Sequence, residues 1–222
     1  ECRYQFSVMA GTLFNDSHLP LPKWFLAIFL ITESKKGMSA LQLKRLLKVS
    51  YKTAWYLCHR IRAAMIDPNE QPLTGTVEVD ETYIGGQRRG VGRGRYKSSK
   101  TMIIAALQRD GDIRVRTGAR NDRTTLHGVI KSNVADSAEN IYTDGLQSYI
   151  GCGDKNTKHE AVKHHEGEYA RGTIHTNTVE GAFGLFKRAI VGSYHQISVK
   201  HIDRYIDEFE FRYNNRKNAY LF

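Results

Sequence analysis

The segment 76–86, Thr-Val-Glu-Val-Asp-Glu-Thr-Tyr-Ile-Gly-Gly, constrains the fold of this chain more than any other part of the sequence. The β-branched residues Thr76, Val77 and Val79 predict a strand, because such side chains suit a half-buried pleated surface. Acidic residues also occur at 78, 80 and 81, and burying an unpaired charge is costly. A divalent cation would compensate a carboxylate at Asp80. An edge strand with solvated acids explains this stretch equally well when it is read alone.

Composition limits the classes of protein to consider. The chain has 222 residues, of which 41% are hydrophobic, enough for one sizeable domain and a small one or for two modest domains. Its formal net charge of +10 favours a polyanionic partner, with nucleic acid first and an anionic membrane surface second. The three cysteines, Cys2, Cys58 and Cys152, are scattered, which indicates a reducing compartment and no complete zinc site. The longest apolar run, 24–31, is shorter than the about 20 residues that span a bilayer, and the first residues lack a signal-peptide pattern.

The first third of the chain has helical periodicity. Pro20 and Pro22 stand where a first helix begins, and residues 39–65 predict two helices joined at Val49 and Ser50. In the first helix of this pair Leu43, Leu46 and Leu47 are expected on the inner face. The pattern is typical of a helix-turn-helix, whose second helix enters a major groove of DNA, although a plain helical hairpin remains open.

Two basic segments favour the DNA interpretation. The outer face of the second helix offers candidate DNA contacts, which are Lys52, Tyr56, His59, Arg60 and Arg62. The segment 87–100 is rich in glycine and basic residues, has no acid and lacks the order of a nucleotide-binding P-loop, so we interpret it as a mobile loop that contacts phosphates. Its candidate contacts are Arg88, Arg89, Arg93, Arg95, Lys97 and Lys100.

The pattern changes after the polar segment 67–72, which contains two prolines and is predicted to be a linker. Strands are predicted at 77–84, 102–108, 113–117, 140–143 and 159–162. Helices are predicted at 124–134, 178–191 and 199–213, with another beginning at 146–149. These elements together predict an α/β fold with a mixed sheet.

Three acidic residues form the chemical pattern. Asp80 and Asp144 are both expected at strand ends, a common place for ligands in open α/β sheets. Glu180 is expected on a helix, with Asn177 and Lys187 on the same face. Carboxylates that hold a metal pair, followed by a lysine, suit phosphodiester chemistry. Each acid alone has a simpler explanation, since Asp-Gly is commonly a turn and a helical Glu is commonly solvated.

These motifs resemble the DDE transposases of bacterial insertion sequences, and in particular the ISXO-like group. The resemblance rests on residues 77–86, on Tyr142-Thr143-Asp144-Gly145, and on the block from His175 to Arg188, with weaker similarity at both ends of the chain. It implies an RNase H-like (integrase-like) core with a mixed five-stranded sheet flanked by helices. A small all-α helix-turn-helix region would precede this core. Three acidic positions of the core would bind two Mg²⁺ or Mn²⁺ ions.

The resemblance also implies roles for individual residues. Asp80 and Asp144 match the first two acids, and Lys187 matches the family's lysine. Glu180 is preferred as the third metal ligand because a carboxylate neutralises a hard cation better than an amide, with Asn177 as the alternative. His175 and Glu81 are expected to support the site, and Arg188 to contact DNA.

The implied organisation has three parts: a remnant of a zinc ribbon or connector at 1–20, a DNA-binding region at 21–68 and a catalytic domain at 74–217. The family usually has an N-terminal zinc ribbon, of which only Cys2 remains here, so the chain is expected to be N-terminally truncated and to bind no zinc.

The implied function is metal-dependent DNA strand cleavage and strand transfer at insertion-sequence ends. The partners would be the terminal inverted repeats and target DNA, and the protein would be at least a dimer, located with the nucleoid in the bacterial cytoplasm and not at a membrane. The alternatives are a non-catalytic DNA-binding protein, either a repressor or an inactivated transposase, and a cellular nuclease of the same fold.

Overall fold

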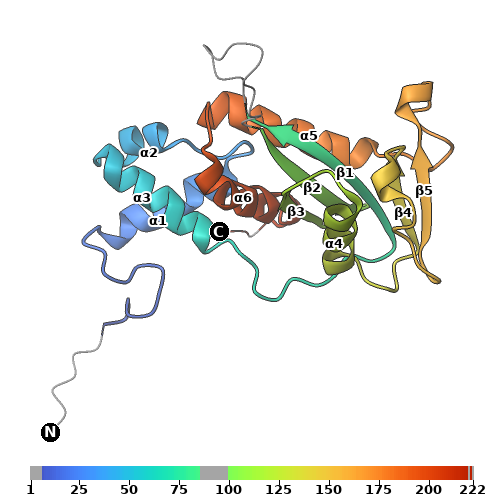
Figure 1. The fold of residues 1–222 in the computed structure, drawn as a ribbon. Coiled ribbons are helices and arrows are strands. Elements are labelled where there is room, and N and C mark those ends of the chain that lie inside the picture. The colour runs from blue at the N-terminus through green and yellow to red at the C-terminus, as the bar shows by residue number, and fades with distance from the viewer. Residues whose placement is uncertain (1–6, 86–99, 220, 222) are drawn as a thin grey trace, which may run out of the picture.

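The computed structural model describes residues 7–85, 100–219 and 221. It places three helices beside a mixed sheet that has helices on both faces (Figure 1). The sheet and its helices form one layered body, and the three N-terminal helices lie at one end of it (Figure 1).

The N-terminal helices are α1 (Leu21–Glu33), α2 (Ala40–Leu47) and α3 (Tyr51–Ala63). Serine caps define the last two, as the sequence predicts: the Ser39 hydroxyl accepts a hydrogen bond from the Gln42 amide at 3.2 Å, and that of Ser50 from the Thr53 amide at 3.1 Å. Between them the chain turns at Lys48, which has a left-handed backbone (φ 51°).

A small apolar core holds these helices together. The buried side chains of this core are Trp24, Ala27, Ile31, Met38, Leu43, Leu47, Ala54, Leu57, Cys58, Ile61 and Met65. The prediction that Leu46 shares this inner face is wrong, because its side chain is 54% exposed. A helix as short as α2 buries a narrow stripe, which Leu43 and Leu47 already occupy at a spacing of four residues.

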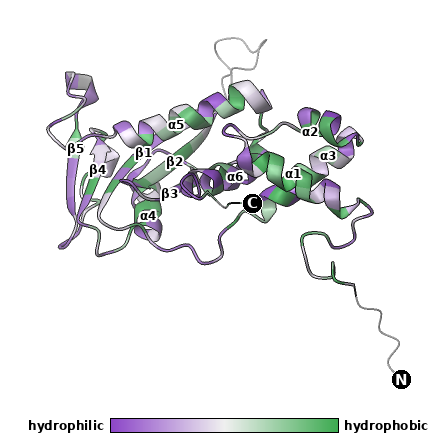
Figure 2. Ribbon diagram, turned by 180° about the vertical axis from the view of Figure 1, so that it is seen from behind, coloured by the Kyte–Doolittle hydropathy of each residue, from purple (hydrophilic) through white to green (hydrophobic). Residues whose placement is uncertain are grey.

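Five strands form the sheet: β1 (Thr76–Ile84), β2 (Thr101–Gln108), β3 (Ile113–Gly118), β4 (Asn140–Asp144) and β5 (Lys158–Val162). Their order is β3-β2-β1-β4-β5. Strands β1, β2 and β3 are antiparallel neighbours, whereas β4 pairs in parallel with both β1 and β5. Strand β1 is therefore central, which excludes the edge-strand interpretation. Hydrophobic colours cover β2 and hydrophilic ones the edge strand β5 (Figure 2).

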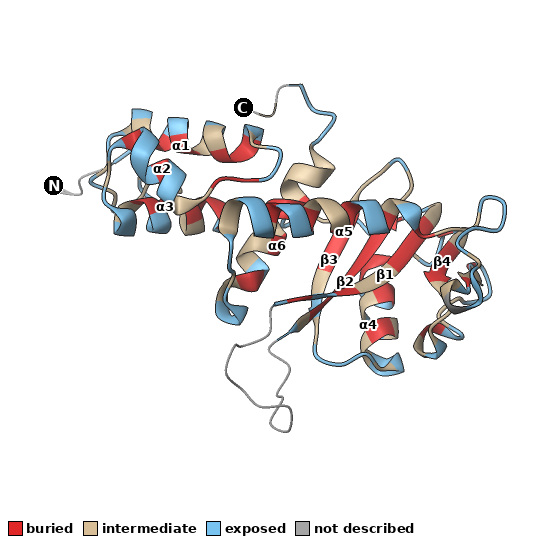
Figure 3. Ribbon diagram, turned by 90° about the horizontal axis from the view of Figure 1, so that it is seen from above, coloured by how far each residue is buried: buried red, intermediate tan, exposed pale blue. Residues whose placement is uncertain are grey.

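Helices cover both faces of the sheet. Helix α4 (Arg123–Asn133) packs on one face, and α5 (Asn177–Ala189) and α6 (Ile202–Asn214) pack on the other. Side chains alternate between the faces along β1: Val77 and Val79 join the α4 core, and Ile84 joins the α5 and α6 core. Figure 3 shows α5 lying across the strands, with buried residues on its sheet side.

The strand order, the antiparallel β1-β2-β3 meander and the crossover through α4 to a parallel β4 define an RNase H-like fold. The predicted fold class is thereby confirmed. Shorter elements complete the chain: 3-10 turns at Gln147–Tyr149, His164–Glu166 and Val199–His201, and a π-helical turn at Ile190–Tyr194. Among the described residues, no helix is both long and apolar enough to cross a membrane.

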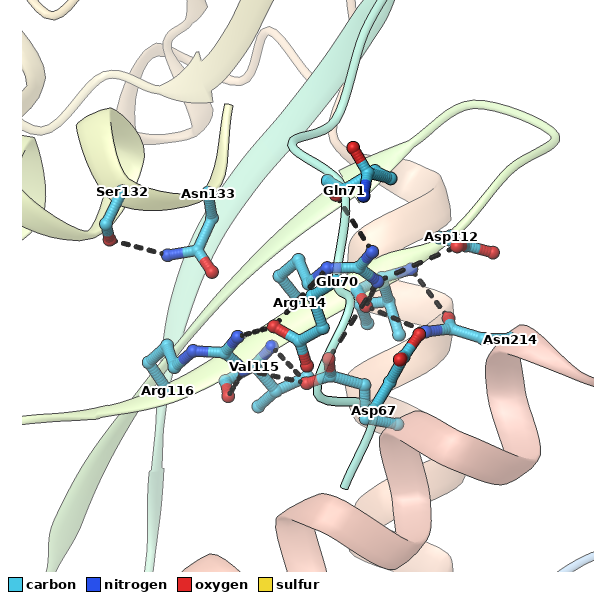
Figure 4. Close-up of polar contacts among 12 residues, drawn as sticks. Asp67, Glu70, Gln71, Asp112, Arg114, Val115, Arg116, Ser132, Asn133 and Asn214 are labelled. Carbon is cyan, nitrogen blue, oxygen red and sulfur yellow. Dashed lines mark hydrogen bonds and ion pairs between the residues drawn. The ribbon is translucent and has the colours of Figure 1, made fainter. Parts of the chain in front are cut away.

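Ion pairs and hydrogen bonds hold the linker and the residue after it against the rest of the domain. The linker residue Glu70 forms ion pairs with Arg116 and Arg114 of β3, and the carbonyl of Gln71 accepts from Arg114 at 3.0 Å (Figure 4). Directly after the linker, the amide of Leu73 donates to the carbonyl of Asn133, the last residue of α4, and the carbonyl of Leu73 accepts from the amide of Ala135, both at 2.8 Å. The predicted linker is therefore held against the sheet by these contacts.

Candidate active site

The register of β1 and β4 brings two of the predicted acids to the same level of the sheet. These strands run parallel, with Glu78 paired to Tyr142. Two residues further along each strand lie Asp80 and Asp144, and residues two apart on a strand share a face. Both carboxylates therefore lie on the side of the sheet that α5 covers.

The sequence predicted Asp80 at the end of its strand, but the structure places it within the strand. Strand β1 continues to Ile84 because β2 pairs with it along its whole length, whereas β4 ends at Asp144. Asp80 therefore lies within β1, two residues beyond the last β1–β4 pair and level with the end of β4.

Charge repulsion is concentrated at Asp80. Burial, followed by the negative charges of Glu81, Asp144 and Glu180, raises the pKa of its carboxyl to about 7, against the hydrogen bond of 2.9 Å that Asp80 accepts from the Glu81 amide. Near neutral pH Asp80 is thus balanced between its neutral and charged forms, as is common for functional carboxylates.

The third predicted acid, Glu180, lies in the first turn of α5. Its carboxylate accepts a hydrogen bond of 2.8 Å from the hydroxyl of Thr176, and it is 45% exposed. Asn177 is the first residue of α5 and is exposed. Lys187 and Arg188 are exposed in its last turn. Glu180 is close enough to influence Asp80 electrostatically, and within the described chain no three His, Cys, Asp or Glu side chains are already gathered as metal ligands.

Glu81 points to the opposite face of the sheet from Asp80. Its carboxylate accepts hydrogen bonds from the Tyr149 hydroxyl at 2.7 Å and from the Asn121 amide at 3.2 Å. Burial raises its pKa, and the two donors oppose that shift. Glu81 therefore lies away from the side of the sheet that α5 covers, and its supporting role stays a prediction.

Sequence reasoning missed the most buried acid of the strand. Glu78, one of the acids that an edge strand would leave in solvent, has a side chain that is 0% exposed. It accepts from Arg109 at 2.7 Å, and Arg109 in turn donates to the carbonyls of Thr173 at 2.7 Å and His175 at 3.1 Å. The available signal was its spacing: Glu78 is two residues before Asp80 and must share its face.

The helical candidates for DNA contact divide into two groups. Lys52 and Tyr56 are exposed on α3, and Arg60 is half-buried and hydrogen-bonded to the hydroxyl of Tyr56. The prediction that Arg62 lies on this outer face is wrong: its side chain is 2% exposed and bonds Glu208 of α6 at 2.6 Å. Arg62 follows Ile61 and Cys58 in the stripe of α3 that turns inward, and α6 supplies the carboxylate that makes its burial possible.

His59 is also turned away from the outer face. Its ring lies 4.2 Å from that of Trp55 and 4.9 Å from that of His201, and its Nε2 atom is buried. Burial, followed by the charge of Arg62, lowers its pKa to about 4. These residues line a cavity of about 520 Å³ between α3 and the segment that precedes α6.

The loop candidates Arg88, Arg89, Arg93, Arg95 and Lys97 lie outside the described residues, as does Cys2. Lys100 is described and is exposed directly before β2.

Comparisons with known proteins agree with this architecture. A family model described as "ISXO2-like transposase domain" matches residues 72–214, which is more than half of the chain. A protein of Halobacterium salinarum, described as an uncharacterized protein in transposable element ISH50, is 29% identical over 227 residues, covering 96% of this chain and 76% of that protein.

Two crystal structures align more loosely. A pre-cleavage Mos1 transpososome aligns with 91% of this chain and 78% of its own at 12% identity and a TM-score of 0.34. The Mos1 strand transfer complex aligns with 90% of this chain and 76% of its own at 11% identity and a TM-score of 0.35. Alignments this loose do not bear on the function.

The family match places this RNase H-like protein in the transposase class. The chain belongs to the ISXO2-like transposase family, as the match over residues 72–214 shows. Membership of this family supports a function in the transposition of a mobile element.

Proposed function

We propose that this protein is a DDE transposase that cuts and joins DNA strands at the ends of an insertion sequence. The observation that carries the proposal is the placement of Asp80 and Asp144 on one face and at one level of adjacent parallel strands. The raised pKa of Asp80, about 7, supports a site suited to positive charge, because burial and then the neighbouring acids disfavour its charged form.

The donor set fits Mg²⁺ or Mn²⁺, with two ions expected. Asp80 and Asp144 would hold them with hard carboxylate oxygens, and Glu180 would complete the set from α5, with Asn177 as the alternative. Bound ions of this kind supply Lewis-acid activation of a phosphodiester and of the attacking hydroxyl group. Zinc is not expected, because the described cysteines, Cys58 and Cys152, are single thiols.

The other residues of the chain would bind and orient DNA. Lys187 and Arg188, exposed at the far end of α5, would hold backbone phosphates near the carboxylates. In α3, Lys52, Tyr56 and Arg60 would contact the terminal inverted repeats, so that residues 21–68 recognise DNA and residues 74–217 act on it. Because two element ends must be joined, the active form would be at least a dimer.

Two alternatives are distinguished by activity. A repressor or inactivated transposase would bind end-containing DNA and leave it intact at every Mn²⁺ concentration. A cellular nuclease would cleave it without joining strands. The proposal expects Mn²⁺-dependent nicking of end-containing DNA, and joined product when a duplex with a pre-cut 3′ end is supplied with target DNA. Intact DNA throughout the titration, or hydrolysis alone, would reject it.

A further inference from the structure

The N-terminus of α5 is capped from a distant strand. The first turns of α2, α3 and α4 are capped by the residues before them, Ser39, Ser50 and Asp122. Helix α5 has no such cap from Thr176, whose hydroxyl donates to Glu180 instead. The free amides at a helix start require acceptors, particularly where they are buried.

Glu78 supplies those acceptors. One of its carboxylate oxygens accepts from the amides of Thr178 at 2.9 Å and Val179 at 3.1 Å. The other oxygen accepts from the Thr178 hydroxyl at 2.9 Å and from Arg109 at 2.7 Å. A negative charge at this position also complements the positive end of the helix dipole.

Arg109 holds the carboxylate and the approach to the helix together. Its guanidinium bonds the carbonyls of Thr173 and His175, the residues that lead into α5, and lies 4.9 Å from the ring centroid of Tyr142 on β4. Strand β1, strand β4 and the start of α5 are therefore tied at one point. This point is two residues from Asp80 on one chain segment and two residues from Glu180 on another.

We infer that Glu78 is a positioning residue of the candidate active site: it fixes the start of α5, and thereby Glu180, relative to Asp80 and Asp144. This role rests on the proposed function, because it has meaning only if these acids bind metal together. Glu78 would act through the helix and the side chains it carries, without contacting metal or DNA itself.

The sharpest variant is Glu78→Gln, which keeps the size of the side chain. Arg109 and the amides of Thr178 and Val179 can only donate, and each oxygen of Glu78 accepts from at least one of them, so the NH₂ of a glutamine must face a donor whichever way it is turned. Glu208→Gln is the matched control: Glu208 is also 0% exposed and paired with an arginine, Arg62, but it lies on α6.

The test measures Mn²⁺ binding by titration, without DNA, and amide hydrogen exchange of the full chain. For Glu78→Gln we expect faster exchange at Thr178 and Val179 and a loss of Mn²⁺ affinity of about tenfold or more, in the range found when residues that orient metal ligands are changed. For Glu208→Gln we expect wild-type exchange at these two amides and wild-type Mn²⁺ affinity.

Three results would overturn the inference. Wild-type exchange at Thr178 and Val179 in Glu78→Gln would show that the cap is not needed. Faster exchange with unchanged Mn²⁺ affinity would reduce Glu78 to a structural cap. An equal loss of affinity in Glu208→Gln would indicate general loosening. If the wild type binds no Mn²⁺, or binds it as well as Asp80→Ala does, the proposed function fails first, and the inference fails with it.

Discussion

At the scale of single residues, three acids that are close in the sequence have different environments in the structure. Glu78 is buried and paired with Arg109, Asp80 faces other acids, and Glu81 is bonded to Tyr149 on the opposite face. Alternation along a strand accounts for the division, because residues 78 and 80 share one face and residue 81 takes the other. Only Asp80 is left with uncompensated negative charge.

The charge of Asp80 should make the stability of the metal-free protein depend on pH. Folding raises its pKa from 3.8 to about 7, so the folded protein holds this proton more tightly than the unfolded chain. The stability that the folded protein gains by binding this proton is complete below about pH 4 and is lost as the pH rises through 7. In EDTA at pH 8, Asp80→Asn should therefore be more stable than the wild type, on the order of 1–3 kcal/mol.

Urea denaturation at pH 5 and at pH 8 measures this difference. The gap between Asp80→Asn and the wild type should be much smaller at pH 5. Asp136→Asn, a change at an exposed aspartate after α4, should show no gap at either pH. An equal gap for Asp80→Asn at both pH values would disprove the electrostatic explanation.

The sequence pattern predicted that Asp80 and Asp144 lie on neighbouring strands, but it did not predict that Arg62 is buried. A helical period places Arg62 near the border of the inner stripe of α3, where a charged residue is normally assigned to solvent. The carboxylate that makes its burial possible is on Glu208, 146 positions away in the sequence. Likewise Glu78 appeared solvated because its partners, Arg109 and the amides of α5, meet it only in the folded sheet.

At the scale of elements, the five predicted strands agree with the observed ones to within one residue at each end. Strong β-branched runs bounded by glycine and aspartate make such strands readable from sequence. The prediction of two continuous closing helices was less accurate, because a π-helical turn at Ile190–Tyr194 and a 3-10 turn at Val199–His201 replace their ends. Tyr194 of the π-helical turn donates to Glu208 at 2.5 Å, a tertiary contact that the local sequence pattern does not reveal.

The buried ion pair of Arg62 and Glu208 joins α3, the candidate DNA-binding helix, to α6 of the candidate catalytic domain. Arg62 bonds Glu208 at 2.6 Å, and its guanidinium lies 4.0 Å from the ring centroid of Tyr205 on α6. Truncating one member of a buried ion pair leaves the other charge uncompensated, at a cost of about 3–5 kcal/mol. Because Arg212 also lies 3.3 Å from Glu208 and keeps part of the compensation, Arg62→Ala should lower the free energy of unfolding by the lower end of this range, about 3 kcal/mol.

Urea denaturation checks this value, with Arg45→Ala as a control at an exposed arginine of α2. We expect Arg45→Ala to remain within about 0.5 kcal/mol of the wild type. If Arg62→Ala were as stable as the wild type, the buried pair between α3 and α6 would not contribute to stability as we predict.

At the scale of the whole molecule, the formal net charge of +10 favours DNA without saying which surface binds it. Lys52 is an exposed residue of α3 and is a candidate phosphate contact. Lys52→Ala should weaken binding to end-containing DNA and reduce the slope of log K against log salt by about 1.

Fluorescence anisotropy at several salt concentrations measures this slope. Lys155→Ala removes another exposed lysine, from the connection between β4 and β5, and it should leave the slope unchanged. Equal effects of the two substitutions would mean that only net charge matters and that α3 is not the DNA-binding helix.

The central claim is that the carboxylates brought level by β1 and β4 perform metal-dependent cleavage. The most direct measurement is nicking of end-containing DNA in Mn²⁺ by the wild type, Asp80→Ala and Asp144→Ala, with DNA binding measured on the same preparations. We predict nicking by the wild type alone and nearly equal binding by all three proteins. Retained nicking by either purified variant would contradict the claim.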